Sequence, residues 1–334
     1  MKTIRLFLLS VILLSFSFKG IAQKVNGISF VASGDSISHV HTNPVKKVNA
    51  NYVALMPFGF IRELSSPEIR FNEKRQWFGE RDEGIQQYAR EFRKKGIKVM
   101  LKPQIWVWGG KYTGHIEMNS EEQWKMLEDS YERFILTYAK TAQKIKVDIF
   151  SIGTELEKFV FNRPDYWKSL IKKIRKVYKG KLTYASNWDE FKRVKFWDQL
   201  DYIGIDAYFP VTAEKTPSVK DFEKGWKQHK NEIKKIQKNF NKPVLFTEFG
   251  YRSLHYTGKE PWDSKRVAGS IDLEAQANGL QAIYNQFWKE KWFAGGFVWK
   301  WFHRHDRVGG KDNNRFTPQN KPAEALLQKL YKLN

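Results

Sequence analysis

Two stretches of the chain end an apolar run on a glutamate, a residue type that can donate a proton or attack a carbon centre. Residues 148–157 read DIFSIGTELE, and residues 243–251 read PVLFTEFGY. A carboxylate at the rim of an apolar core is costly unless it is hydrogen-bonded or used. The pattern therefore predicts paired acid–base or nucleophilic chemistry at Glu155 and Glu248, facing each other across one site.

The two stretches belong to a series of short apolar segments that alternate with segments of mostly helical spacing. This order predicts parallel βα units, and eight of them predict one closed (β/α)8 barrel of the TIM type. A doubly wound open sheet is disfavoured, because no glycine-rich phosphate loop follows the first strand. The expected strands are residues 27–31, 51–56, 97–106, 148–155, 182–188, 202–210, 244–251 and 295–302. The expected helices are residues 84–95, 120–144, 165–178, 219–240, 272–289 and 323–331, with loops at 32–41 and 57–80.

In a barrel of this kind the active site lies at the carboxyl ends of the strands. Side chains alternate along a strand, so residues two apart share a face. The sets that share a face are Lys102, Gln104 and Trp106; Ser151, Gly153 and Glu155; Gly204, Asp206 and Tyr208; Phe246 and Glu248; and Phe297, Trp299 and Trp301. Polar and aromatic side chains are therefore expected to gather at one end of the barrel.

Two carboxylates on facing strands suit glycoside hydrolysis. One protonates the leaving oxygen, and the other attacks the anomeric carbon or activates water. Tryptophans such as Trp106 and Trp299 offer flat apolar faces for sugar rings, and Asn187 offers a hydrogen-bonding amide for hydroxyl groups. The residue types therefore indicate a carbohydrate substrate.

The assignment of the two carboxylates has alternatives. Glu157 lies two residues beyond Glu155 and can be the acid instead, although it is expected to open the following loop or helix. Glu248 can be a structural carboxylate paired with Arg252, which is close in sequence.

Lys102 and four histidines have alternative roles as well. A buried lysine is rare unless it is paired, so Lys102 either forms a structural pair with Asp206 or lines the cleavage subsite. Metal-dependent barrel hydrolases use a His-x-His pair near the first strand, but no histidine closes the fifth or sixth strand here. We therefore expect neither a metal nor an organic cofactor. The two His-x-His pairs are His39 with His41, and His303 with His305.

Five motifs follow one another along the chain: IGTE (152–155) continued by LEKF, SNW (186–188), IGIDAYFP (203–210), FTEFGYRS (246–253) and GFVWKWF (296–302). Each motif is only moderately specific, but the ordered set is specific. The set resembles glycoside hydrolase family 113, retaining (β/α)8-barrel enzymes related to clan A that include endo-β-1,4-mannanases. The resemblance runs through nearly all of the chain after its first residues, from GISF to VWKWF.

The resemblance implies roles for particular residues. Glu155 matches the acid/base of the clan, and Glu248 matches its nucleophile. Tyr208 resembles the tyrosine that hydrogen-bonds the nucleophile, and Trp299 resembles the platform under the sugar at the cleavage point.

One position departs from the pattern of the clan. Many members have Asn directly before the acid/base, where its amide holds the sugar 2-hydroxyl, whereas this chain has Thr154. Another group must hold that hydroxyl, and Asn187 is the candidate. The full set of predicted substrate-binding residues is Lys102, Trp106, Asn187, Tyr208 and Trp299.

The first 22 residues are typical of a secretory signal peptide. Lys2 and Arg5 precede an apolar run at 6–18, and small residues follow at 20–22. The run is too short for a convincing membrane anchor, and the absence of cysteine excludes a lipidated one. We therefore expect a secreted or periplasmic protein whose catalytic domain spans residues 23–334, with no stable membrane anchor and no disulfides.

The charge of the chain is strongly basic, with 58 Lys and Arg against 36 Asp and Glu, a formal net charge of +22. The lysines are spread along expected helix faces without a nucleic-acid reading motif, so nucleic acid is not an expected partner. The expected partner is a polysaccharide or oligosaccharide substrate, and the expected state is a monomer. An anionic glycan favoured by the basic surface is an alternative.

Together these features predict a secreted retaining β-glycoside hydrolase, an endo-β-1,4-mannanase that cleaves mannan or glucomannan by double displacement. One alternative is the same machinery acting on another β-linked glycan. The other is a non-catalytic carbohydrate-binding barrel.

Overall fold

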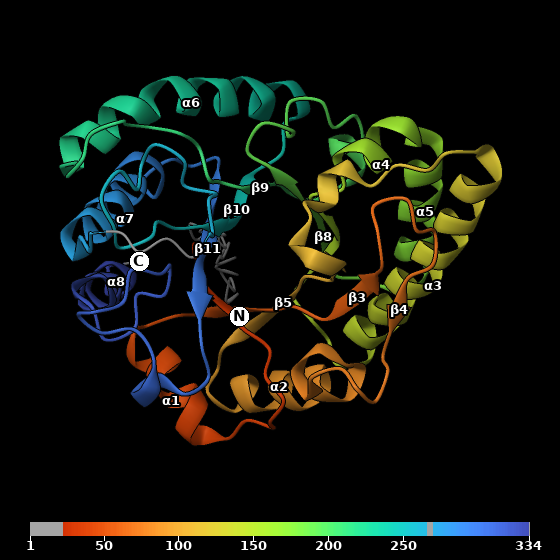
Figure 1. The fold of residues 1–334 in the computed structure, drawn as a ribbon, viewed down its shortest axis with the longest axis horizontal. Coiled ribbons are helices and arrows are strands. Elements are labelled where there is room, and N and C mark those ends of the chain that lie inside the picture. Colours follow the sequence, from red (N-terminus) through yellow and green to blue (C-terminus); the bar gives the residue numbers. More distant parts are fainter. Residues whose placement is uncertain (1–22, 266–269, 334) are drawn as a thin grey trace, which may run out of the picture.

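The chain folds into a barrel of parallel strands ringed by helices (Figure 1). The computed structural model describes residues 23–265 and 270–333, so the predicted signal peptide lies outside the described residues. Within these residues, eight strands close the barrel in the order β1-β11-β10-β9-β8-β7-β5-β2, which confirms the predicted (β/α)8 fold. The strands are β1 (Val25–Phe30), β2 (Tyr52–Leu55), β5 (Lys98–Leu101), β7 (Ile149–Thr154), β8 (Lys181–Asn187), β9 (Ile203–Asp206), β10 (Val244–Phe249) and β11 (Phe293–Trp301).

The helices begin and end at signals that are visible in the sequence. Ser120 caps α3, where its hydroxyl accepts a hydrogen bond of 3.2 Å from the Gln123 N–H. Gly96 follows α2 with φ +70°, the left-handed conformation that glycine adopts at no steric cost. No helix in the described part of the chain is long and apolar enough to cross a membrane. The helices are α1 (His39–Lys47), α2 (Asp82–Lys94), α3 (Glu121–Lys144), α4 (Glu157–Asn162), α5 (Pro164–Val177), α6 (Val219–Phe240), α7 (Leu273–Phe287) and α8 (Pro322–Lys332).

Helix α1 was not expected, because residues 32–41 were predicted as a loop. The helix buries only Thr42 and Val45 and carries Pro44 in its interior. A helix with so few apolar positions has no clear 3.6-residue pattern. The periodicity of these residues therefore does not predict the helix, which follows β1 as the first helix of the barrel.

The loop predicted at 57–80 and the single strand predicted at 97–106 are both wrong in detail. The chain beyond β2 and β5 continues into a second, three-stranded sheet in the order β4-β3-β6, formed by Arg70–Phe71, Phe58–Ile61 and Gln104–Val107. Pro57 and Pro103 separate each barrel strand from its extension, because proline has no N–H for the ladder. This small sheet stands at the carboxyl end of the barrel and forms part of the wall of the site.

The barrel interior is apolar in one layer and polar in another. The apolar layer is an inner cluster distinct from the core between strands and helices, and it consists of Val25, Ala54, Met100, Ile149, Leu245 and Phe297. The Phe297 ring occupies the space beside Gly27, where an added Cβ would lie 2.3 Å from its Cδ1. Nearer the carboxyl ends of β5, β9 and β10, the buried side chains are polar: Lys102, Asp206 and Thr247. The interior therefore becomes polar where the strands end.

Candidate active site

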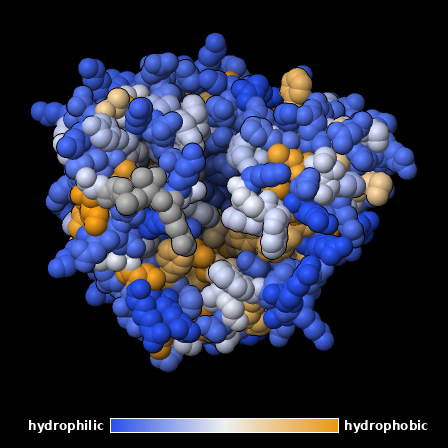
Figure 2. Space-filling view, in the orientation of Figure 1, coloured by the Kyte–Doolittle hydropathy of each residue, from blue (hydrophilic) through white to orange (hydrophobic). Residues whose placement is uncertain are grey.

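A cavity of about 1090 Å³ opens at the carboxyl ends of the barrel strands. The space-filling view shows the corresponding hollow near the centre of this face (Figure 2). The cavity is lined by residues from β3, β6, β7, β8, β10 and β11 and from the loops of the barrel, including Tyr208 after β9. Six of the residues predicted from sequence are among them: Trp106, Glu155, Asn187, Tyr208, Glu248 and Trp299.

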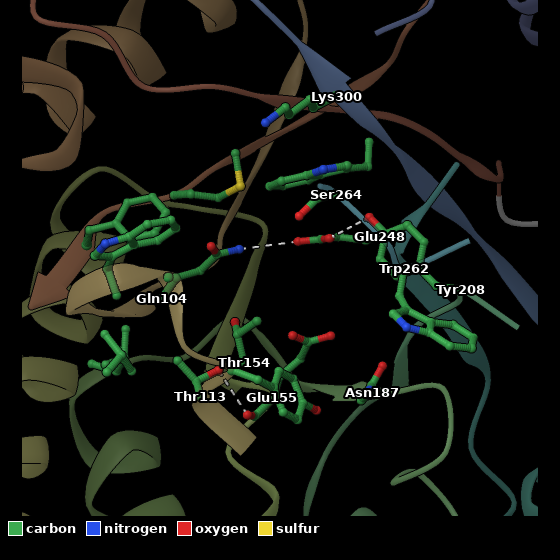
Figure 3. A pocket seen from close by; sticks show the side chains of 18 of the residues that line it. Gln104, Thr113, Thr154, Glu155, Asn187, Tyr208, Glu248, Trp262, Ser264 and Lys300 are labelled. Atoms are coloured by element: carbon green, nitrogen blue, oxygen red, sulfur yellow. Dashed lines mark hydrogen bonds between the residues drawn. The ribbon is translucent and has the colours of Figure 1, made fainter. Parts of the chain in front are cut away.

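Glu248 is held in place by three donors, two of which, Tyr208 and Gln104, are labelled in Figure 3. The Tyr208 hydroxyl donates to Oε2 at 2.8 Å, and the Gln104 amide donates to Oε1 at 3.2 Å. The Lys102 ammonium also donates to Oε1. Glu248 is only 6% exposed but lines the cavity, and these hydrogen bonds fix the orientation of its carboxylate. A carboxylate held in a fixed orientation is the group that a glycosidic nucleophile requires.

Glu155 enters the cavity across from Glu248 (Figure 3). It follows the last residue of β7 and has φ +50°, a left-handed conformation that is uncommon for a residue with a side chain. Burial raises the pKa of Glu155 well above its usual range, and the nearby negative charges of Asp206 and Glu248 raise it further. Glu155 is therefore suited to be the protonated carboxyl of the pair.

Irregularities in β7 and β10 bring these two glutamates into the cavity, so the expected alternation of side chains is wrong on both strands. Gly153 does not share a face with Glu155: a Cβ there would lie 2.7 Å from the Tyr131 hydroxyl, on the helix side of the sheet. Phe246 likewise packs outward, whereas neighbouring Thr247 and Glu248 both point inward. The strand pairing shifts at both places, as it does at β-bulges, which re-aim side chains at the ends of barrel strands.

On β11 the residues expected to share one face, Phe297, Trp299 and Trp301, do not all do so. Trp299 lines the cavity, and Lys300 does so as well. Trp301 is fully buried in the core between strands and helices and does not line the cavity, so its predicted place beside Trp299 is wrong. The Lys300 ammonium lies 5.2 Å from the centre of the Trp299 ring. Burial lowers the pKa of Lys300, which the charge of Glu248 partly offsets.

Asn187 reaches the cavity from the end of β8, and a buried glutamate that sequence reasoning missed supports it. Glu190 Oε2 accepts a hydrogen bond of 3.0 Å from the Asn187 N–H, and Oε1 accepts one of 2.8 Å from the Tyr184 hydroxyl. That hydroxyl accepts in turn from the Leu156 N–H at 2.7 Å, next to Glu155. Burial raises the pKa of Glu190 to about 8. The signal was available, because Asn-x-x-Glu is a capping-box spacing.

Aromatic side chains lie on both sides of the two glutamates. Trp106 on β6 and Trp77 line one part of the cavity and are 48% and 56% exposed. On the Tyr208 side lies Trp262, which is 43% exposed and stacks on Trp188 with ring centres 5.2 Å apart and planes 18° apart (Figure 3). Trp262 was missed because it belongs to the long segment after β10 and to no strand end.

The alternative assignments for the carboxylates are placed away from the cavity. Glu157 opens α4 and forms an ion pair with Arg193, and it does not line the cavity. Arg252 donates to the carbonyl oxygens of Asn314 and Asp263, whereas the ion-pair partner of Glu248 is Lys102.

Lys102 lies beneath the cavity and not in it. Its side chain has 0% exposure, and its ammonium contacts both carboxylate oxygens of Asp206, at 3.1 and 3.0 Å, as well as Glu248. The predicted pairing with Asp206 is therefore present. The predicted direct contact with substrate is not available to a fully buried side chain, so Lys102 reaches the site only through Glu248.

One histidine of each pair lies beside the other, but His305 has a different partner. His41 and His303 lie with ring centres 5.6 Å apart, whereas His305 bonds Glu324 at 2.8 Å. Across residues 23–265 and 270–333, no group of three or more His, Asp or Glu side chains is placed to hold a metal ion.

Comparisons with known proteins agree with this geometry. A family model described as Glycoside Hydrolase Family 113 matches residues 34–321. The GH113 β-mannanase AaManA from Alicyclobacillus acidocaldarius superposes with a TM-score of 0.80 at 23% identity, covering 93% of this chain and 97% of that chain. A GH113 β-1,4-mannanase in a complex structure gives 0.79 at 23% identity, covering 93% and 100%. A Faecalibacterium prausnitzii β-glucuronidase gives 0.61 at 16% identity, covering 93% and 49%. No curated protein matches the sequence.

A closed (β/α)8 barrel with two glutamates in a cavity at the carboxyl ends of its strands defines a barrel glycoside hydrolase. Within that class, the chain belongs to Glycoside Hydrolase Family 113, as the resemblance of its motifs indicated. Its substrate is accordingly a carbohydrate.

Proposed function

We propose that this glycoside hydrolase is a retaining endo-β-1,4-mannanase, exported by its predicted signal peptide and acting on mannan or glucomannan. The observation that carries the proposal is the contrast between two glutamates in one cavity. Glu248 is fixed by an ammonium, an amide and a phenol, whereas burial raises the pKa of Glu155. The mannan substrate is supported by the family structures described as β-mannanases, to which this fold is similar.

The first step forms a covalent intermediate. An oxygen of Glu248 bonds to the anomeric carbon as the glycosidic bond breaks, and its electron pair moves to the leaving oxygen. That oxygen takes the proton from Glu155. The raised pKa of Glu155 keeps this proton available at a pH where an exposed glutamate would have lost it.

The second step releases the sugar by reversing these roles. Glu155, now ionised, takes a proton from a water molecule, whose oxygen bonds to the anomeric carbon. The electron pair of the ester bond returns to Glu248. Because both steps invert the anomeric carbon, the product keeps the β configuration.

The aromatic side chains on both sides of the glutamates support cleavage inside a chain. A sugar chain that stacks on Trp106 at one side and on Trp262 at the other must extend in both directions from the cleavage point. Trp299 lines the same cavity and is the residue proposed to carry the sugar at the reacting carbon.

Analysis of the products from manno-oligosaccharides, with the anomer followed by NMR, tests the proposal. We expect β-anomers at the earliest times and internal cleavage of longer oligosaccharides. An α-anomer as first product would show inversion and refute the retaining mechanism. A panel of β-linked polysaccharides tests the substrate: cleavage of a glucan in preference to mannan would refute the mannanase assignment but not the hydrolase.

Replacement of Trp262 by alanine is expected to reduce kcat/KM about tenfold for long manno-oligosaccharides and to leave short ones nearly unchanged, because only a long chain reaches this ring. Rates measured against oligosaccharide length test this expectation. Phe161→Ala is the matched control, since Phe161 is exposed but does not line the cavity. Equal losses for short and long substrates would contradict a role in a distant subsite.

A further inference from the structure

Two buried carboxylates share one buried ammonium under the cavity. Lys102 and Asp206 are 0% and 1% exposed, and the ammonium bonds both oxygens of Asp206 while it also bonds Glu248. Thr247 adds a hydrogen bond of 2.7 Å to Asp206 Oδ1. Asp206 does not line the cavity, so it cannot touch a substrate directly.

The cluster has one ammonium group for two carboxyl groups. Burial opposes the charge of Lys102, but Asp206 and Glu248 outweigh it and raise its pKa, so the ammonium is charged. Burial, followed by the charge of Glu248, raises the pKa of Asp206 to about 7. Asp206 is thus a costly group. Without Asp206, Lys102 and Glu248 would form a single ion pair with no net charge.

We propose that Asp206 is a positioning residue that sets the balance between the two chemical steps by sharing Lys102 with Glu248. The inference rests on the proposed double displacement. In the first step Glu248 is the nucleophile, and full pairing with an ammonium would make its electron pair less available. Asp206 takes part of that ammonium, so Glu248 keeps more of its nucleophilic character.

The second step has the opposite requirement. The ester bond between Glu248 and the anomeric carbon breaks as the water oxygen bonds to that carbon, and the electron pair returns to Glu248. An ammonium bonded to Glu248 stabilises this developing charge. Whatever strengthens the contact between Lys102 and Glu248 therefore slows the first step and does not slow the second.

The Asp206→Asn variant separates this role from a structural one. Asparagine keeps the shape and one oxygen acceptor for Lys102 but removes the competing charge. A 2-deoxy-2-fluoro-β-mannosyl fluoride allows both steps to be followed by intact mass spectrometry, as formation and decay of the adduct on the full chain. We expect formation to slow by about ten- to a hundredfold, while decay is unchanged or faster.

Two further variants make the outcome decisive. Asp201→Asn is the control: it makes the same substitution just before β9, at an aspartate bonded to Arg175. This variant should leave both rates unchanged. Thr247→Val removes the hydrogen bond that stabilises the charged form of Asp206. Its two rates should change in the same direction as those of Asp206→Asn, but by less. This variant tests the proposal if Asp206→Asn does not fold.

Equal slowing of both steps in these variants, or no change in either, would overturn the role of Asp206 while leaving the proposed function intact. If the wild-type protein forms no adduct at Glu248, the proposed function itself fails, and this inference fails with it.

Discussion

The Glu248→Ala variant is expected to lose hydrolysis of manno-oligosaccharides by about 10⁴-fold or more, the largest effect of any substitution in the chain. Alanine removes the atom that bonds to the anomeric carbon, and Asp206, the other carboxylate bonded to Lys102, cannot replace it. Asp206 is buried behind Lys102 and does not line the cavity. Steady-state rates with an activated aryl β-mannoside measure the loss.

The lost activity should be recoverable with azide in a way that reports the role of Glu248. Alanine leaves space on the side of the sugar from which Glu248 attacks, and azide can enter there. A single displacement then gives the α-mannosyl azide, with the anomeric carbon inverted. A β-azide from this variant, or full activity without azide, would contradict the assignment of Glu248 as nucleophile.

Glu157→Ala is the matched control for both catalytic substitutions. It removes a glutamate close to Glu155 in sequence, but that glutamate begins α4 and pairs with Arg193 outside the cavity. We expect hydrolysis to stay within about twofold of the wild type, since surface ion pairs contribute little to stability. A large loss in this variant would reopen the choice between Glu155 and Glu157.

The barrel itself could be predicted from sequence because its signal is repeated. Each strand is a short apolar run, and segments with helical spacing separate most of them, so errors at single elements did not change the fold. The missed elements carry weak patterns: α1 buries only Thr42 and Val45, and the second sheet is made of strands of two to four residues, two of which Pro57 and Pro103 separate from the barrel strands before them. Such segments depend on tertiary contacts.

The sequence predicts residues that the structure brings into one cavity, but it does not predict the geometry that brings them together. Glu155 and Glu248 were chosen because each ends an apolar run, and both do reach the cavity. The alternation used to orient them fails at β7 and β10, where the pairing register shifts. A period-2 pattern cannot reveal an inserted residue, since a bulge changes the face of everything after it.

Residues that act from loops or from beneath the site were the hardest to foresee. Trp262 belongs to a loop after β10, and loops carry no periodic signal. Glu190 is buried behind Asn187, where only its spacing marks it. Lys102 was correctly linked to Asp206, but its second partner, Glu248, became visible only when the strands were assembled.

The second large effect is expected at Glu155. Glu155→Ala should slow hydrolysis of oligosaccharides by about 10²- to 10⁴-fold, because their leaving oxygen needs a proton. A dinitrophenyl β-mannoside, whose leaving group needs none, should still form the intermediate, so it accumulates as a burst. Measurement of kcat/KM for both substrates separates these cases. Equal losses for the two would contradict a proton-donor role.

The pH dependence follows from the raised pKa of Glu155. The working form is protonated, so kcat/KM of the wild type should fall as pH rises through that pKa, which lies well above the ordinary glutamate value of 4.5. In Glu155→Ala this alkaline limb should vanish from the residual hydrolysis of manno-oligosaccharides, whose leaving oxygen needs the proton. If the limb persisted, it would have to belong to another buried carboxyl, and Asp206, with a pKa of about 7, is the candidate.

Azide distinguishes the two glutamates most directly. In Glu155→Ala the intermediate on Glu248 forms normally, and azide can displace it without a general base, giving the β-mannosyl azide by two inversions. Glu248→Ala gives the α-azide by one. Opposite anomers from the two variants would assign acid/base and nucleophile independently of any rate. The same anomer from both would mean that the two glutamates do not act on opposite faces of the sugar, and the double displacement would have to be abandoned.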